Sequence, residues 1–402
     1  MLPYKDDDIL KVEPELNFEF EEKNSQLVLN HITPERLFEC WNETMNQIDA
    51  LCKKKKYSHA IQVVNSLISI LSNVHEYCNE FLFDVTFLTS FEQSLFFKYI
   101  PNFLLSINNN IKLTVLKFFI CFSTISCDFI DIIIPIFISN GIFPHYLKHE
   151  NNTDSITSYF YILIGLFSQY SGQFNQYLID TNFFDSNYFL FMDSNLNVKF
   201  QIVNFINRMT QNCSDNIQFK NSLKSFLLLI NQLKDFLRLF YQKKYEELNS
   251  LEKEFALSIL DIFQNLFFIP DFKEIIFKEN ISQFILDQIV NCDKDVNFFD
   301  KFFHHSLQII NYDFDNIQQL ENVEKFSLLC IKINYFLNNG SFFEKPKIIK
   351  TVISMIRKCK KDFNSIFISL SDSLKSYINA ETNLHDEIVS CLEFMGVTDI
   401  FD

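Results

Sequence analysis

The sequence predicts an all-α protein, built as a right-handed solenoid of stacked helical repeats. The first observation behind this prediction is that only 5 glycines and 8 prolines occur among the 402 residues. Hairpin turns between strands draw heavily on glycine and on Asn-Gly steps, so a sheet protein of this length would need more of them. The second observation is an apolar pattern of helical spacing that recurs with a period of about 43 residues. A period of this size is typical of stacked helical units.

Five amphipathic segments carry apolar residues at positions i, i+3, i+4 and i+7, which lie on one face of a helix. Their first members lie 44, 43, 57 and 44 residues apart. The longer step indicates an insertion at about residues 237–250, where we expect a long helix to be extended. The five sets are Val115/Phe118/Phe119/Phe122, Tyr159/Ile162/Leu163/Leu166, Ile202/Phe205/Ile206/Met209, Ile259/Ile262/Phe263/Leu266 and, more weakly, Phe303/Ser306/Leu307/Ile310.

Turn residues recur at matching places in these repeats. Gly141 ends the apolar stretch FISN, Asn182 and Asn280 take the same place in later copies, and Gly340 in FLNNGSFF marks another. Glycine and asparagine tolerate the left-handed backbone conformation that ends many helices. We therefore expect each copy to contain a helix, a turn, a second short helix and then a longer third helix.

The apolar run around FIDIIIPIF is not expected to cross a membrane. A membrane helix needs about 20 mostly apolar residues. Here Asp128 and Asp131 interrupt the run, and Pro135 and Gly141 are expected to break the apolar stretch after them. The start of the chain, MLPYKDDDIL, also lacks the basic and apolar regions of a signal peptide.

The stretches ISNGIFPHYLKHENNTDSITSYFYILIGLFSQ and ILDIFQNLFFIPDF resemble the armadillo repeat. The resemblance covers about residues 98–312 and implies an armadillo-like α-solenoid. In armadillo proteins the third helices line a concave groove that binds extended peptides or partner domains. Nuclear-import adaptors of this family place an asparagine two positions after the leucine of the third helix, with a companion row of tryptophans. The corresponding positions here, which are the candidate protein-binding residues, are Cys121, Gly165, Arg208, Asn265 and Ile309.

One asparagine among five positions does not make a ladder, and the single tryptophan, Trp41, lies outside the repeats. The groove is therefore expected to be less polar than that of an import adaptor and suited to a helix or a folded partner.

Four regions can be distinguished from these patterns. Residues 1–30 form an acidic tail in which apolar residues alternate with acids, either a binding segment or a solubilising one. Residues 31–97 form an N-terminal helical cap that begins near Pro34, a favoured first helical residue. Residues 98–312 hold the armadillo-like repeats, and residues 313–402 hold C-terminal helical repeats and a cap.

Charge and cysteine content narrow the range of partners and compartments. The net charge is −15 and the isoelectric point about 5.0, which argues against general binding of nucleic acid or of an anionic membrane surface. The 10 cysteines are scattered without a CxxC pair, which is typical of a reducing compartment. We expect the protein in the cytoplasm, with the nucleus as a second location.

The sequence offers little for catalysis. Phosphate-binding glycine loops, GxSxG and HExxH are absent. His145 and His149 have the i, i+4 spacing of metal ligands but lack an identifiable third ligand. The neighbours His304 and His305 are about 100° apart on a helix, so one of them is expected to lie half-buried against the next repeat. We expect no catalytic residue, no cofactor and no metal site.

The leading functional prediction is a non-catalytic scaffold or adaptor that binds a partner protein or peptide on the solenoid. Two alternatives stay open. One is a nucleocytoplasmic transport adaptor for basic signals, favoured by the acidic chain and disfavoured by the missing ladder. The other is a helical ligand-binding protein or enzyme with a polar pocket around one of the two histidine pairs.

Overall fold

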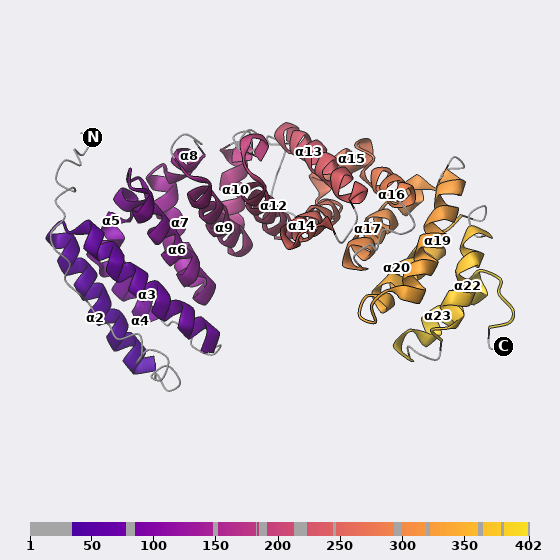
Figure 1. The fold of residues 1–402 in the computed structure, drawn as a ribbon, viewed down its shortest axis with the longest axis horizontal. Coiled ribbons are helices and arrows are strands. Elements are labelled where there is room, and N and C mark those ends of the chain that lie inside the picture. Colours follow the sequence, from indigo (N-terminus) through magenta and orange to yellow (C-terminus); the bar gives the residue numbers. More distant parts are fainter. Residues whose placement is uncertain are drawn as a thin grey trace. The chain divides into compact units, whose positions relative to one another are not determined.

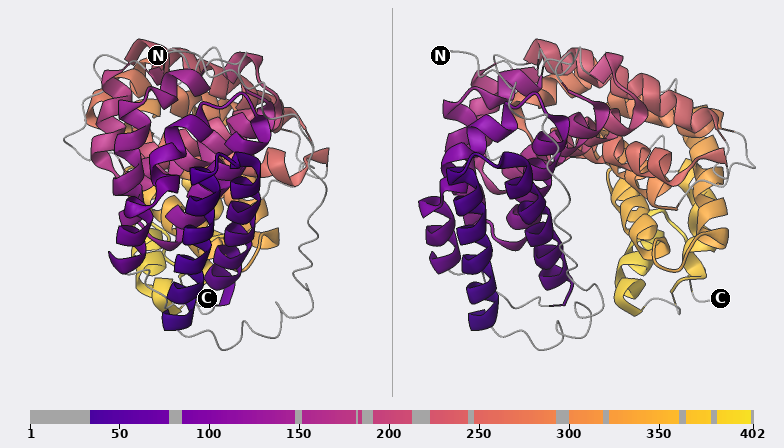
Figure 2. Two further views of the ribbon diagram at one scale, coloured as in Figure 1. Left: turned by 90° about the vertical axis from the view of Figure 1, so that its left-hand side faces the viewer. Right: turned by 60° about the vertical axis from the view of Figure 1, so that its left-hand side comes forward.

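The computed structural model of the chain describes residues 34–77, 85–147, 152–181, 183–184, 191–212, 223–243, 247–292, 300–318, 322–360, 365–378 and 382–400. Within these ranges all regular structure is helical and no strand occurs (Figures 1 and 2). The predicted all-α class is therefore confirmed. The predicted acidic tail of residues 1–30, the turn residue Asn182 and His149 lie outside the described residues.

The chain divides into two compact units between Tyr99 and Ile100, inside helix α5 (Leu95–Leu104). The sequence placed the end of its N-terminal cap between residues 97 and 98. Unit 1 contains α2 (Pro34–Lys53), α3 (Tyr57–Tyr77) and α4 (Val85–Gln93). The first helix among the described residues, α2, begins at Pro34, the residue that the sequence favoured.

Unit 1 is organised around α2. Trp41 on this helix is buried and packs edge-on against Phe87 of α4. Asp49, one turn from the end of α2, accepts hydrogen bonds at Oδ1 from the backbone N–H groups of Leu95 and Phe96, at 2.8 and 3.1 Å. The first N–H groups of a helix have no partner within the helix, so this carboxylate from α2 caps α5.

Unit 2 is built on a row of long helices, each of which packs on the next one in the chain (Figure 1). In order they are α6 (Asn109–Ile125), α9 (Asp154–Tyr170), α12 (Leu196–Gln211), α14 (Ser250–Leu266), α17 (Asp300–Tyr312), α20 (Lys345–Arg357) and α23 (His385–Phe394). We call this set the long-helix row. The remaining elements are α7 (Asp128–Ser139), α8 (Ile142–Tyr146), α10 (Gly172–Asp180), α13 (Leu223–Gln242), α15 (Pro270–Lys278), α16 (Ile281–Asn291), α18 (Phe314–Ile317), α19 (Val323–Asn339), α22 (Ser371–Lys375) and the short 3₁₀ turns Ile368–Leu370 and Thr382–Leu384.

Local sequence explains where the first long helices start. Asn108, Thr153, Asn195 and Asn249 precede α6, α9, α12 and α14, and each side chain accepts a hydrogen bond from a backbone N–H of the first turn. The last forms a reciprocal capping box with Glu252. Short polar side chains at this position stabilise a helix by about 1 kcal/mol.

The turns partly follow the prediction. Gly141, between α7 and α8, and Asn280, between α15 and α16, both have the left-handed backbone, with φ of 63° and 49°. Gly340 does not, because α19 ends there in extended backbone with φ −70°. Pro135 lies inside α7 rather than breaking it, so the break falls at the Asn140-Gly141 step.

Helix α13 and the buried phenylalanines complete the description of unit 2. Helix α13 ends at Gln242 and α14 begins at Ser250, so α13 covers only the first part of the stretch 237–250 where the sequence predicts an extended helix. Phenylalanine fills much of the interior: Phe119, Phe137 and Phe167 are fully buried, and the ring of Phe137 lies against the rings of the other two.

Candidate functional site

The long-helix row leaves one side of its central helices uncovered. Helices α12, α14 and α17 bury their apolar residues against neighbours and keep one stripe each that is exposed or half-buried. We call these stripes together the open face. Its members are Asn204, Asn207, Arg208, Gln211, Ser258, Asp261, Gln264, Asn265, His305 and Gln308.

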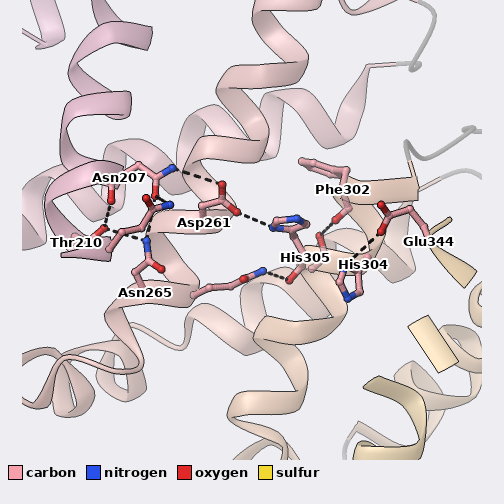
Figure 3. Close-up of polar contacts among 11 residues, drawn as sticks. Asn207, Thr210, Asp261, Asn265, Phe302, His304, His305 and Glu344 are labelled. Atoms are coloured by element: carbon pink, nitrogen blue, oxygen red, sulfur yellow. Dashed lines mark hydrogen bonds and ion pairs between the residues drawn. The ribbon is translucent and has the colours of Figure 1, made fainter. Parts of the chain in front are cut away.

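Side-chain hydrogen bonds join α12 to α14 across the open face (Figure 3). The Nδ2 atom of Asn265 donates to Asn207 Oδ1 at 3.0 Å and to Thr210 Oγ1 at 3.2 Å. The Nδ2 atom of Asn207 in turn lies 3.5 Å from Asp261 Oδ2. These amides hold the two helices in register. Asn265 thereby uses both N–H donors of its side chain within the protein, and Oδ1 is the polar side-chain atom that these two bonds do not use.

The same network continues from α14 to α17 (Figure 3). The Nδ1 atom of His305 lies 2.7 Å from Asp261 Oδ1, and the side-chain amide of Gln264 donates to the backbone carbonyl of His305 at 3.0 Å. Three successive long helices are thus tied together by polar side chains on one face.

His304 points away from its neighbour, toward the start of α20 (Figure 3). Its Nδ1 lies 3.6 Å from Glu344 Oε2, and both side chains are nearly inaccessible, with residue exposures of 7% and 5%. Glu344 also pairs with Lys347 at 3.0 Å. Burial, together with the nearby His305, lowers the pKa of His304 to about 4, while Glu344 raises it and Lys347 lowers it. The expectation that the two histidines face different ways, with one of them packed against the next helix, is therefore confirmed.

The five candidate residues from the armadillo resemblance differ in how far the structure buries them. Cys121 on α6 is half-buried, and Arg208 and Asn265 belong to the open face. Gly165 on α9 is buried against α12, where it serves packing. Ile309 on α17 is 0% exposed: its apolar side chain lies in the core, and its backbone carbonyl accepts a hydrogen bond from the Ser282 hydroxyl.

Arg208 is the most unusual member of the open face. Its stem crosses Gly165 of α9, where an added Cβ would lie 3.4 Å from Arg208 Cδ. Its Nη1 atom is buried and has no hydrogen-bond partner among the described residues. Burial lowers the pKa of the guanidinium, and the nearby Tyr170 raises it. A desolvated guanidinium donor without an acceptor is costly, so this group is suited to an oxygen acceptor supplied from outside.

Replacing Gly165 tests this close approach of α9 and α12. Gly165→Leu is expected to lower the free energy of unfolding by about 1–3 kcal/mol, because its side chain must displace the Arg208 stem or the Phe205 backbone, whose Cα would be 3.6 Å from the new Cβ. Gly165→Ala should be nearly neutral, since its contact is only slightly tight and alanine favours a helix. Urea unfolding followed by circular dichroism measures both.

Gly172, the first residue of α10, provides the matched control. Nothing lies within 4 Å of a Cβ added there. Gly172→Leu should leave the unfolding free energy within about 0.5 kcal/mol of wild type. Equal losses for the two leucine variants would contradict the packing role of Gly165.

Sequence reasoning missed Asn207, Thr210, Asp261 and Gln264 as members or neighbours of this face. A signal was present: polar residues recur at helical spacing in NFINRMTQN and LDIFQN, on the side opposite the apolar set. The import-adaptor pattern considers a single position in each repeat, so it does not identify the other polar residues on this side of each helix.

Metal and membrane sites can be addressed for the described ranges. No group of three or more His, Cys, Asp or Glu side chains there could hold a metal ion. His145 lies on α8, and its predicted companion is not among the described residues. Within the same ranges no single helix has the length and apolar character to cross a membrane, although α14 and α15 pass that test as a pair bent by 99°.

Comparison with known proteins gives a likeness of fold alone. No family model matches the chain, and no curated protein sequence matches it. Solved structures do match, among them the crystal structure of an engineered protein from the Northeast Structural Genomics Consortium. The alignment covers 92% of this chain and 97% of that one, with a TM-score of 0.56 and 8% sequence identity.

Proposed function

We propose that the protein is a non-catalytic scaffold or adaptor that holds a partner protein or peptide on the open face. Its unit 2 is, in this proposal, an armadillo-like right-handed solenoid, and the long-helix row supplies the third helices of the repeats. The first residues of successive long helices lie 40 to 54 positions apart, which supports a period near 43. The row includes α20 and α23, so the repeats would continue beyond residue 312.

The observation that carries the proposal is the polar bonding of α12, α14 and α17 on their uncovered side. A binding surface gains affinity when it is held rigid before the partner arrives, because less conformational entropy is lost on binding. The hydrogen bonds from Asn265 and Gln264 provide that rigidity. Arg208 adds a buried donor that an acceptor on the partner could satisfy.

The cysteines of the described ranges support a non-catalytic role in a reducing compartment, which we propose is the cytoplasm, with the nucleus as a second location. All eight are free thiols. Burial raises the pKa of Cys52, Cys359 and Cys391 to about 11 and that of Cys330 to about 12. Such thiols stay protonated at neutral pH and are poor nucleophiles.

Affinity capture with the full chain tests the proposal. We expect the wild-type protein to enrich a partner from a native cell extract, and Arg208→Ala with Asn265→Ala to reduce its recovery at least tenfold. A buried charged hydrogen bond lost at an interface costs about 2–5 kcal/mol, which is more than tenfold in affinity. Quantitative mass spectrometry of the bound fraction reads the result.

Arg238→Ala is the matched control. This arginine on α13 is about half exposed, at 47% of its side chain, and is paired with Asp235 on the same helix. Its loss should leave recovery unchanged. Recovery of the same partner in full by the Arg208/Asn265 variant would contradict the open face as the binding surface.

A further inference from the structure

The face of α20 that is not packed is basic. Helix α20 packs on α17, α19 and α23, and these contacts bury Ile348, Ile349, Val352, Ile353 and Ile356. The exposed side chains that remain on it, Lys347, Lys350 and Arg357, follow helical spacing and lie on one side.

This basic face stands in an acidic protein. The whole chain has a net charge of −15, yet residues 331–361 hold a single acid, Glu344, against eight Lys and Arg. The eight are Lys332, Lys345, Lys347, Lys350, Arg357, Lys358, Lys360 and Lys361. Segregation of charge on this scale is not needed for folding, because exposed charges of mixed sign serve solubility equally well.

Some of these cations are already engaged and others are not. Lys358 donates to the backbone and side-chain oxygens of Asn311, and Lys332 donates to the carbonyl of Cys292. Lys350 and Arg357 form no ion pair with any side chain that the structure describes. Two cations without an ion-pair partner in those ranges therefore remain on the uncovered side of α20.

Two exposed phenylalanines adjoin the start of this helix. Phe342 and Phe343 directly precede Glu344 and are 74% and 81% exposed. Their rings lie 6.0 Å apart, edge to face. Large apolar side chains with this exposure next to exposed cations form a mixed apolar and basic surface, which we call the α20 surface: Phe342, Phe343, Lys347, Lys350 and Arg357.

We propose that the α20 surface binds a short acidic segment of a partner protein that also carries aromatic or aliphatic side chains. This inference rests on the proposed scaffold function and names the chemistry of one partner element. Charge complementarity selects acids for Lys350 and Arg357, and the two phenylalanines select apolar neighbours of those acids. Lys347 and Arg357 are ten residues apart, about 15 Å along the helix, which an extended peptide spans in about five residues.

A short acidic segment fits this surface better than nucleic acid does. Binding of nucleic acid depends on many phosphates meeting many cations, and the α20 surface offers only Lys347, Lys350 and Arg357. A peptide of a few residues needs only the local patch. Nucleic acid therefore enters as an outcome of the test.

The test uses the full chain and fluorescence anisotropy with the labelled peptide EEFDEFLEE at low salt. We expect Lys350→Glu with Arg357→Glu to weaken binding by about tenfold or more, since two attractive contacts become repulsive. Phe342→Ser with Phe343→Ser should weaken it as well. Raising the salt concentration should weaken wild-type binding, because exposed charges are screened.

The matched control is Lys98→Glu with Lys278→Glu, two exposed lysines on α5 and α15. It changes the net charge equally and should bind the peptide as wild type does. Equal weakening by both double variants, wild-type binding by the α20 variant, or tighter binding of an oligothymidylate than of the peptide would each overturn the inference.

Failure of this inference is distinguishable from failure of the proposed function. If a captured partner is lost by the Arg208/Asn265 variant but the α20 variant keeps both that partner and the peptide, the scaffold function stands and the inference falls. If the peptide binds through the α20 surface while the Arg208/Asn265 variant keeps every partner, the surface stands and the open face does not.

Discussion

Phe119→Ala is expected to lower the free energy of unfolding of unit 2 by about 3–5 kcal/mol, the usual cost of removing a buried phenylalanine ring. Phe119 on α6 is 0% exposed, and its ring lies 5.7, 5.8 and 6.1 Å from the rings of Phe118, Phe129 and Phe137. Those neighbours come from two helices, so the cavity cannot close by a single side-chain movement. Urea unfolding followed by the helical circular dichroism signal measures the loss.

Phe342→Ala is the matched control for this prediction, because the same ring is removed from a side chain that is 74% exposed. Its unfolding free energy should stay within about 0.5 kcal/mol of wild type. A loss for Phe119→Ala no larger than that of the control would mean that the aromatic series of α6 and α7 does not contribute to stability as the packing indicates.

Between pH 7 and pH 4, the free energy of unfolding of the wild-type protein is expected to fall by about 2–3 kcal/mol more than that of His304→Gln. Burial and His305 lower the pKa of His304 from 6.5 to about 4, whereas Glu344 raises it and Lys347 lowers it. The unfolded chain therefore takes up the proton first as the pH falls. The contribution of neutral His304 is fully present above pH 6.5 and is lost as the pH falls toward 4.

The measurement is the unfolding free energy at several pH values for wild type, His304→Gln and a control, His59→Gln. His59 is exposed on α3 in unit 1. The control should follow the wild-type pH dependence, and His304→Gln should have a shallower one. A wild-type pH dependence in His304→Gln would contradict the buried, neutral state of this histidine.

The basic surface of α20 shows how far charge can be predicted from composition. The stretch KPKIIKTVISMIR forms α20, in the region where the sequence predicts C-terminal helices, and its lysines are plain in the sequence. Whether those lysines are paired depends on neighbours distant in the chain, such as Asn311 for Lys358. Spacing along the sequence does not predict such contacts. Only the folded structure therefore shows that Lys350 and Arg357 have no ion-pair partner within the described ranges.

The sequence by itself determined the all-α class, the start of α2 at Pro34, the turn at Gly141 and the different directions of His304 and His305. These features depend on residues close together in the chain, through caps, left-handed turns and the 100° step of a helix. Only the tertiary structure decided the burial of Ile309, the contact of Arg208 with Gly165 and the bonding of Asn207, Asp261 and Asn265. These features arise where helices that are tens of residues apart in the chain meet. The period of a repeat does not fix the rotation of each helix about its own axis, because that rotation is set by packing against the neighbouring helices.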